Sequence, residues 1–312
     1  MKRPNAWFPA GWVLGLLILP AWIASETVGA DWVYEDVAYG EHERHRLDLY
    51  PVPGASQPTP AVVYFHGGGF VRGDKDRVSR KMIRRLHERG IAVASANYRF
   101  ANQAFLPAPM HDGARAVQYL RHHSERFGLD PDTVAVSGTS AGAGIALWVA
   151  LRDDRRQPES DDPVLRQSSR VSAAWVFDAQ VSYDPAFWEE QGLDGVVTDD
   201  KLRDLFGDVE GFAKLLLMSL IQEASPITHV SDGDPPLRMD YRGSMALDRR
   251  TSAAALLHHP LHGTALAEAC REVGVPCELY YDGGVKPQDS AVDFLAGHLK
   301  NDQTRGQHDH DP

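Results

Sequence analysis

Thr133-Val-Ala-Val-Ser-Gly-Thr-Ser-Ala-Gly142 is the stretch that decides how the rest of this chain is organised. Its first five residues alternate β-branched and small side chains, which predicts a short buried strand. Gly138, Ser140 and Gly142 then fit the spacing Gly-x-Ser-x-Gly, and the apolar run 141–151 predicts a helix packed on a sheet. Ser140 is therefore a candidate nucleophile on a sharp strand-to-helix turn, where the helix N-terminus directs backbone N–H groups at developing negative charge.

A second stretch, Ala61-Val-Val-Tyr-Phe-His-Gly-Gly-Gly-Phe70, predicts a strand that runs into three consecutive glycines. Because glycine has no Cβ, such a loop lets backbone amides approach a ligand closely, as an oxyanion hole requires. The two stretches together favour acyl-transfer chemistry more strongly than either does alone.

With about seventy residues between the two motifs, the chain resembles the α/β-hydrolase superfamily. Within it, the hormone-sensitive-lipase-like and feruloyl-esterase-like (acetyl-esterase-like) carboxylesterases are most similar. Ser95-Ala-Asn-Tyr-Arg99 resembles a strand end of these enzymes, and Phe105-Leu-Pro-Ala108 with Asp112 resembles their next loop and helix start. The resemblance implies oxyanion-hole amides at Gly68 and Gly69, and the geometry of the serine turn adds Ala141. It implies no metal and no organic cofactor.

The order of predicted elements agrees with that family. Residues 32–50 predict an antiparallel hairpin, and strands then alternate with helices along the chain. This alternation predicts an α/β fold with a mostly parallel central sheet and helices on both faces.

The 312 residues, of which 43% are hydrophobic, can form one large core. We expect one hydrolase domain over 31–300 and a disordered polar tail over 301–312. Residues 183–224 depart from the simple pattern, so we expect them to form part of the substrate-pocket wall, with a peripheral packing element as the alternative. The net charge of −11 argues against nucleic acid and anionic membrane surfaces as partners.

Residues 1–30 predict a secretory signal peptide. Lys2 and Arg3 precede an apolar run of about fifteen residues, which is short for a bilayer span. We therefore expect an exported protein, periplasmic or extracellular, without a stable membrane span after cleavage; an uncleaved N-terminal anchor is the alternative. Cys270 and Cys277 are then either two buried thiols or a local disulfide.

A serine nucleophile needs a base and a residue that holds the base in its tautomer. In the resembling family the acid follows the seventh strand, where Asp248 lies in the predicted loop; Asp240 is the alternative. The family's histidine follows the eighth strand, but residues 282–290 contain none. His298 lies too late, inside the last predicted helix.

Other histidines are the remaining candidates for the base. His258, His259 and His262 lie in the segment that leads from the acid loop into the next helix, and we expect His259, supported by Asp248, to reach Ser140. His66 resembles a structural histidine of the family and is not counted as a base.

Three functional hypotheses follow. The first is a serine-dependent carboxylic ester hydrolase that acts on a small-molecule or polysaccharide-linked acyl ester with a displaced base. The second is a non-catalytic binding protein of the same fold. The third is a weak esterase that stabilises the oxyanion without an efficient base.

Overall fold

The computed structural model describes residues 33–208, 213–247, 251–284 and 290–299. The predicted signal peptide, the polar tail and Asp248 lie outside these residues. In the described part of the chain no helix is both long enough and apolar enough to span a bilayer.

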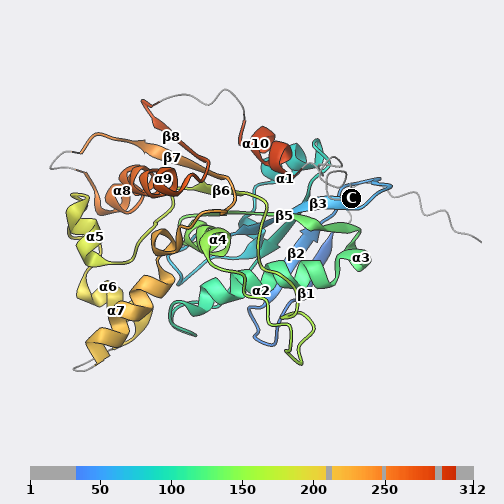
Figure 1. Cartoon of the computed structure of the whole chain (residues 1–312), viewed down its shortest axis with the longest axis horizontal. Coiled ribbons are helices and arrows are strands. Elements are labelled where there is room, and N and C mark those ends of the chain that lie inside the picture. The colour runs from blue at the N-terminus through green and yellow to red at the C-terminus, as the bar shows by residue number, and fades with distance from the viewer. Residues whose placement is uncertain (1–32, 209–212, 248–250, 285–289, 300–312) are drawn as a thin grey trace, which may run out of the picture.

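One eight-stranded sheet forms the centre of the described structure, in the order β1-β2-β4-β3-β5-β6-β7-β8 (Figure 1). The strands are β1 (Tyr34–Ala38), β2 (Arg46–Tyr50), β3 (Thr59–Phe65), β4 (Ala92–Ala96), β5 (Leu129–Thr139), β6 (Ala174–Phe177), β7 (Leu237–Ser244) and β8 (Cys277–Asp282). The pairs β1–β2 and β2–β4 are antiparallel, and all other pairs are parallel. The expected α/β-hydrolase architecture with its N-terminal hairpin is confirmed.

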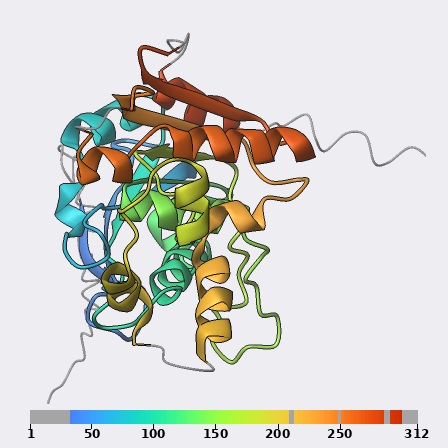
Figure 2. The same ribbon diagram turned by 90° about the vertical axis from the view of Figure 1, so that its left-hand side faces the viewer.

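Helices cover both faces of this sheet (Figures 1 and 2). They are α1 (Arg80–His87), α2 (Ala108–His122), α3 (Ser124–Phe127), α4 (Ala141–Leu151), α5 (Pro185–Glu190), α6 (Asp199–Phe206), α7 (Ala213–Ala224), α8 (Ala253–Leu257), α9 (Leu261–Val273) and α10 (Ala291–His298), with 3-10 turns η1 (Lys75–Arg77) and η2 (Pro226–His229).

Strand alternation divides the core into two layers. Val62 and Tyr64 of β3 pack in the cluster that contains α1 and α10, whereas Val63 and Phe65 pack in the larger cluster with α2 and α4. Because every strand of a parallel sheet is covered on both faces, these strands are apolar on both sides. The carboxyl ends of the strands remain as one edge at which loops gather.

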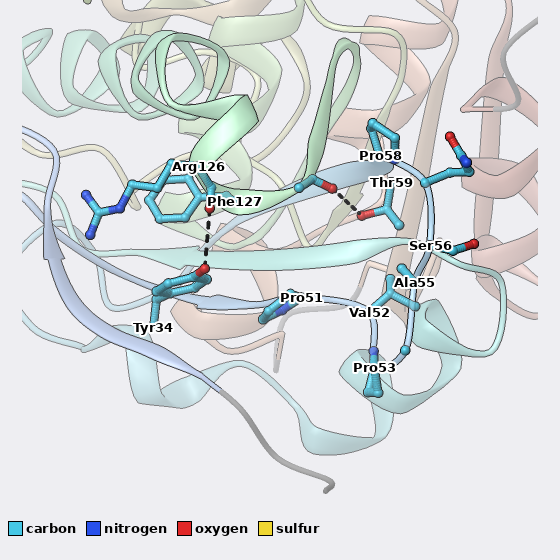
Figure 3. A pocket seen from close by; sticks show the side chains of 13 residues that line it. Tyr34, Pro51, Val52, Pro53, Ala55, Ser56, Pro58, Thr59, Arg126 and Phe127 are labelled. Carbon is cyan, nitrogen blue, oxygen red and sulfur yellow. Dashed lines mark hydrogen bonds between the residues drawn. The ribbon is translucent and has the colours of Figure 1, made fainter. Parts of the chain in front are cut away.

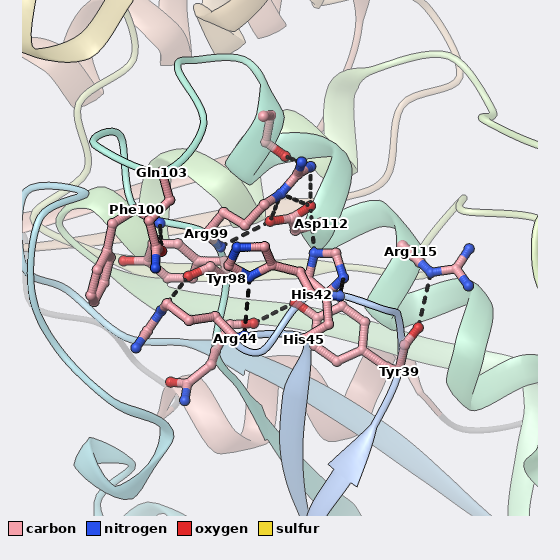
Figure 4. Close-up of polar contacts among 12 residues, drawn as sticks. Tyr39, His42, Arg44, His45, Tyr98, Arg99, Phe100, Gln103, Asp112 and Arg115 are labelled. Atoms are coloured by element: carbon pink, nitrogen blue, oxygen red, sulfur yellow. Dashed lines mark hydrogen bonds and ion pairs between the residues drawn. The ribbon is translucent and has the colours of Figure 1, made fainter.

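A buried polar cluster fastens the hairpin to α2 (Figure 4). The Asp112 carboxylate accepts hydrogen bonds from the backbone N–H of Arg99 at 2.9 Å and from its guanidinium at 2.6–3.0 Å. The His45 Nε2 lies 3.0 Å from the same carboxylate. Burial alone would raise the pKa of Asp112, but the bonds from His45 and Arg99 lower it. Asp112 is thus an ionised structural anchor.

The segment 183–224 forms α5, α6 and α7. Its Tyr183 ring lies 6.0 Å from that of Phe70 in the glycine loop, and Leu106 donates its N–H to the Leu205 carbonyl at 2.9 Å. Trp188 lies 4.4 Å from the His262 ring. The segment therefore contacts both the glycine loop and the histidine-rich segment, and the wall role expected for it stays a prediction.

The two cysteines are both free thiols, with Cys270 buried in α9 and Cys277 half-buried at the start of β8. The structure thus agrees with two unpaired thiols.

Candidate active site

Ser140 lies at the tip of a sharp turn between β5 and α4. Its backbone has φ 54° and ψ −122°, a conformation that is uncommon for a residue with a side chain. Two hydrogen bonds hold the turn: Ser140 donates its N–H to the Phe177 carbonyl at 2.9 Å, and Gly144 donates to the Ser140 carbonyl at 3.0 Å. The neighbouring strand and the first turn of α4 thus fix the serine in a strained position.

The flanking glycines are a steric necessity. A Cβ on Gly138 would lie 2.2 Å from the Gly142 carbonyl oxygen, and one on Gly142 would lie 2.1 Å from the Phe65 carbonyl oxygen. Both obstacles are backbone atoms, which cannot move aside as a flexible side chain can. The pattern that identified the turn in the sequence therefore has a direct physical cause.

The glycine loop lies directly against this turn. A Cβ on Gly67 would lie 3.4 Å from the Ser140 Cβ, and one on Gly68 would lie 1.8 Å from the Arg72 carbonyl oxygen. Gly68 and Gly69 have φ of 140° and 64°, values that favour glycine, and nothing lies within 4 Å of a Cβ built on Gly69. The loop thus lies against the serine at Gly67 and borders open space at Gly69.

His66 supports this loop from below. It is fully buried, its Nδ1 lies 2.9 Å from the Gly67 carbonyl, and its own carbonyl accepts a hydrogen bond from the Tyr98 hydroxyl at 2.7 Å. Burial lowers the pKa of His66 to about 4, so the ring is neutral near pH 7. This agrees with the expectation that His66 has a structural role and is not the base.

The histidine in contact with Ser140 is His258. Its Nε2 lies 2.9 Å from the Ser140 Oγ. The other ring nitrogen, Nδ1, lies 2.9 Å from the Ala254 carbonyl oxygen. A carbonyl can only accept, so this contact assigns the proton to Nδ1 and leaves the Nε2 lone pair free to accept from the serine hydroxyl.

The histidine in contact with Ser140 is thus the residue before the expected one, His259. His259 is 2% exposed, and its Nδ1 accepts a hydrogen bond from the Leu261 N–H at 3.2 Å, within its own turn. The chain turns at the end of α8, so consecutive side chains point in different directions. The expected partner of His259, Asp248, lies outside the described residues. His262 is fully buried beside Phe187 and Trp188, away from this contact.

Gln180 is a residue of the site that the sequence analysis did not single out. It is 4% exposed, and its Nε2 donates to the Leu257 carbonyl at 2.9 Å and to the Asp178 carbonyl at 3.0 Å. One side chain therefore joins the end of β6 to the residue before His258. No short sequence motif predicts this role for a glutamine. Its partners are backbone carbonyls, which every residue has, and one of them lies 77 residues away.

A cavity of about 450 Å³ lies at the opposite edge of the sheet (Figure 3). The connector 51–59, Tyr34 and residues 126–128 line it, at the amino ends of β3 and β5. The Tyr34 hydroxyl donates to the Arg126 carbonyl at 3.4 Å there. Since Ser140 follows the carboxyl end of β5, this cavity takes no part in the site.

Known esterases are similar to this chain in sequence and in fold. The family model BD-FAE matches residues 47–241. The Arabidopsis thaliana "Probable isoprenylcysteine alpha-carbonyl methylesterase ICMEL2" is 35% identical over 234 residues, 75% of this chain and 49% of that protein. The Mycobacterium tuberculosis "Probable carboxylic ester hydrolase LipM" is 28% identical over 206 residues, 64% of this chain and 45% of that protein. The chain thus spans less than half the length of these two relatives.

Solved structures share the fold. A "Truncated form of carbohydrate esterase from gut microbiota" superposes with a TM-score of 0.66 at 18% identity, covering 86% of this chain and 96% of that one. An "acetyl ester-xyloside bifunctional hydrolase" from Caldicellulosiruptor lactoaceticus gives a TM-score of 0.58 at 25% identity, covering 76% of this chain and 77% of that one.

Proposed function

Since the chain belongs to the BD-FAE family of α/β-hydrolase esterases, we propose that it is a serine-dependent carboxylic ester hydrolase. The observation that carries the proposal is the 2.9 Å contact between the Ser140 Oγ and the His258 Nε2. A serine hydroxyl is a poor nucleophile near neutral pH unless a base accepts its proton, and this distance lies within the range for direct proton transfer.

In the first half of the reaction, the Ser140 Oγ attacks the ester carbonyl carbon while His258 Nε2 takes the hydroxyl proton. The backbone amides of Gly68, Gly69 and Ala141 are the proposed donors to the oxyanion that forms. The tetrahedral intermediate then collapses, the C–O bond to the alcohol breaks, and His258 returns its proton to the leaving oxygen.

In the second half, water takes the place of the alcohol. His258 accepts a proton from the water, whose oxygen attacks the acyl-enzyme, and the proton returns to the Ser140 Oγ as the carboxylic acid leaves. Throughout, the proton stays on His258 Nδ1, which donates it in a hydrogen bond to the Ala254 carbonyl. In this proposal the Ala254 backbone carbonyl, by accepting from Nδ1, holds His258 in the tautomer that the reaction needs. The role of Asp248 as the acid stays a prediction from the sequence.

Small acyl esters are the proposed substrates. Solved structures with this fold include a carbohydrate esterase and an acetyl ester-xyloside hydrolase, which supports a carbohydrate-linked acyl ester as the first natural class to test. We also propose export, from Lys2, Arg3 and the apolar run after them. N-terminal sequencing of the protein from its producing cell should find Met1 removed.

A fluorophosphonate probe and 4-nitrophenyl acetate test the chemistry together. Both require an activated serine and a stabilised oxyanion, so the wild type should label and should turn over the ester, and Ser140→Ala should do neither. A folded wild-type protein that does not label would favour the binding-protein hypothesis instead.

A further inference from the structure

A second cavity, of about 440 Å³, lies at the carboxyl edge of the sheet, on the side of α1 and α10. Tyr64, Trp175 and Phe177, at the ends of β3 and β6, form an aromatic part of its lining. The volume lies within the range of small-molecule pockets. An aromatic surface of this kind favours a ligand with a flat ring or a sugar face.

Residues next to the proposed dyad lie at this cavity. Thr139, which precedes Ser140, belongs to its lining, and so does Arg242. The next residue, Gly243, lies close to the histidine, since a Cβ built on it would be 3.9 Å from the His258 carbonyl oxygen. A group bound against Thr139 would therefore lie one residue along the chain from Ser140.

The charge of the cavity is opposite to that of the whole protein. Arg77, Lys81, Arg85 and Arg242 line it, and among the described residues no acidic side chain belongs to its lining, although the chain has a net charge of −11. Arg242 is anchored by Asp178, which accepts hydrogen bonds from its backbone N–H at 3.0 Å and from its Nε at 2.6 Å. Local positive charge in a mostly acidic protein attracts an anionic ligand.

Two of the cations on α1, Lys81 and Arg85, have no carboxylate partner in the described part of the chain. Lys81 and Arg85 lie four residues apart, a spacing at which like charges destabilise a helix. Within the described ranges neither side chain forms an ion pair with a carboxylate, whereas the neighbouring Arg84 pairs with Glu88 at 4.0 Å. Lys81 and Arg85 both line the cavity, where a bound anion would reduce the repulsion between their charges.

We propose that this cavity binds the carboxylate of a ring-bearing ester substrate, with the ring against Tyr64, Trp175 and Phe177 and the carboxylate among the cations. As a substrate subsite it rests on the proposed ester-hydrolase function; as an anion site it does not. Guanidinium groups bind carboxylates through paired N–H donors, which suits Arg85 to this ligand. The Nε and Nη2 of Arg242 already bind Asp178, so Arg242 has only its remaining N–H donors for the ligand.

The first experiment measures binding by calorimetry on the full chain carrying Ser140→Ala, so that it needs no turnover. The probes are two matched pairs, benzoate with benzamide and glucuronate with glucose. We expect at least one acid to bind tenfold or more tightly than its neutral partner. That binding should weaken at least tenfold in Lys81→Met/Arg85→Gln, weaken with added salt, and be unchanged in the control Arg84→Gln.

Equal binding of acid and neutral partner in both pairs, or binding that survives the double substitution, would overturn the proposal. The acid that binds also identifies the ring as aryl or sugar.

The second experiment separates this proposal from the enzymatic one. For the wild type, kcat/KM for monomethyl terephthalate should exceed that for methyl 4-carbamoylbenzoate, and the preference should vanish in the double variant while the amide ester is hydrolysed as before. Hydrolysis without any preference would refute the subsite alone. Carboxylate binding in a protein that hydrolyses no ester would refute the proposed function alone.

Discussion

Replacement of His258 by alanine tests the dyad most directly. In the unliganded structure its Nε2 already lies at hydrogen-bond distance, 2.9 Å, from the Ser140 Oγ, so the base is fully engaged and its removal should take away the whole contribution of general-base catalysis. Such a contribution is about 10²–10⁴-fold. We expect His258→Ala to slow fluorophosphonate labelling by about 10³-fold, with the residual rate supplied by the oxyanion hole.

The matched control is its neighbour, His259→Asn. The Nδ1 of His259 accepts the Leu261 N–H, and an asparagine Oδ1 can accept the same bond, so the turn should keep its shape. Labelling of the folded fraction should stay within about threefold of the wild type, as for a residue that does not touch the reacting atoms. Fast labelling in His258→Ala together with slow labelling in His259→Asn would refute the dyad and restore the assignment made from sequence.

Three further outcomes follow from the geometry. Gly142→Ala places a Cβ 2.1 Å from a backbone carbonyl oxygen and should lower the melting temperature and abolish labelling, whereas Gly297→Ala, on a helix with open space around it, should be neutral or raise the melting temperature. His262 is fully buried, and neither ring nitrogen has a hydrogen-bond partner among the residues that the structure describes. Burial lowers its pKa to about 3, so the folded form resists protonation and the wild type loses stability as pH falls below about 6.5. His262→Leu should raise the free energy of unfolding by about 1–2 kcal/mol at pH 7 in urea titrations and flatten the loss of stability between pH 7 and 5. Asp248→Asn should lower kcat/KM less than about tenfold, since the single Nδ1 proton of neutral His258 is already donated; a loss of about 10⁴-fold would instead show that the carboxylate holds the tautomer.

The mostly parallel sheet with its N-terminal antiparallel hairpin, and the strand–turn–helix around Ser140, could be predicted because they depend on local patterns. Alternating apolar residues fix the strands, and strand–helix alternation leaves a parallel sheet as the way to bury both faces. Gly138 and Gly142 are informative for the same reason: the turn itself excludes their side chains, whatever surrounds it.

Which histidine contacts Ser140 is decided by tertiary structure. His258 and His259 are adjacent, so sequence spacing places both within reach of Ser140, 118 residues away. Which ring meets the serine depends on the turn at the end of α8 and on Gln180, whose bond to the Leu257 carbonyl fixes that turn against β6.

The cationic cavity likewise exists only in the folded chain. Arg77 and Arg242 are separated by most of the domain, and their charges meet because η1 and the end of β7 lie at the same edge of the sheet. A sequence shows which residues can carry charge or accept a proton, but their convergence on one point is set by contacts between distant segments.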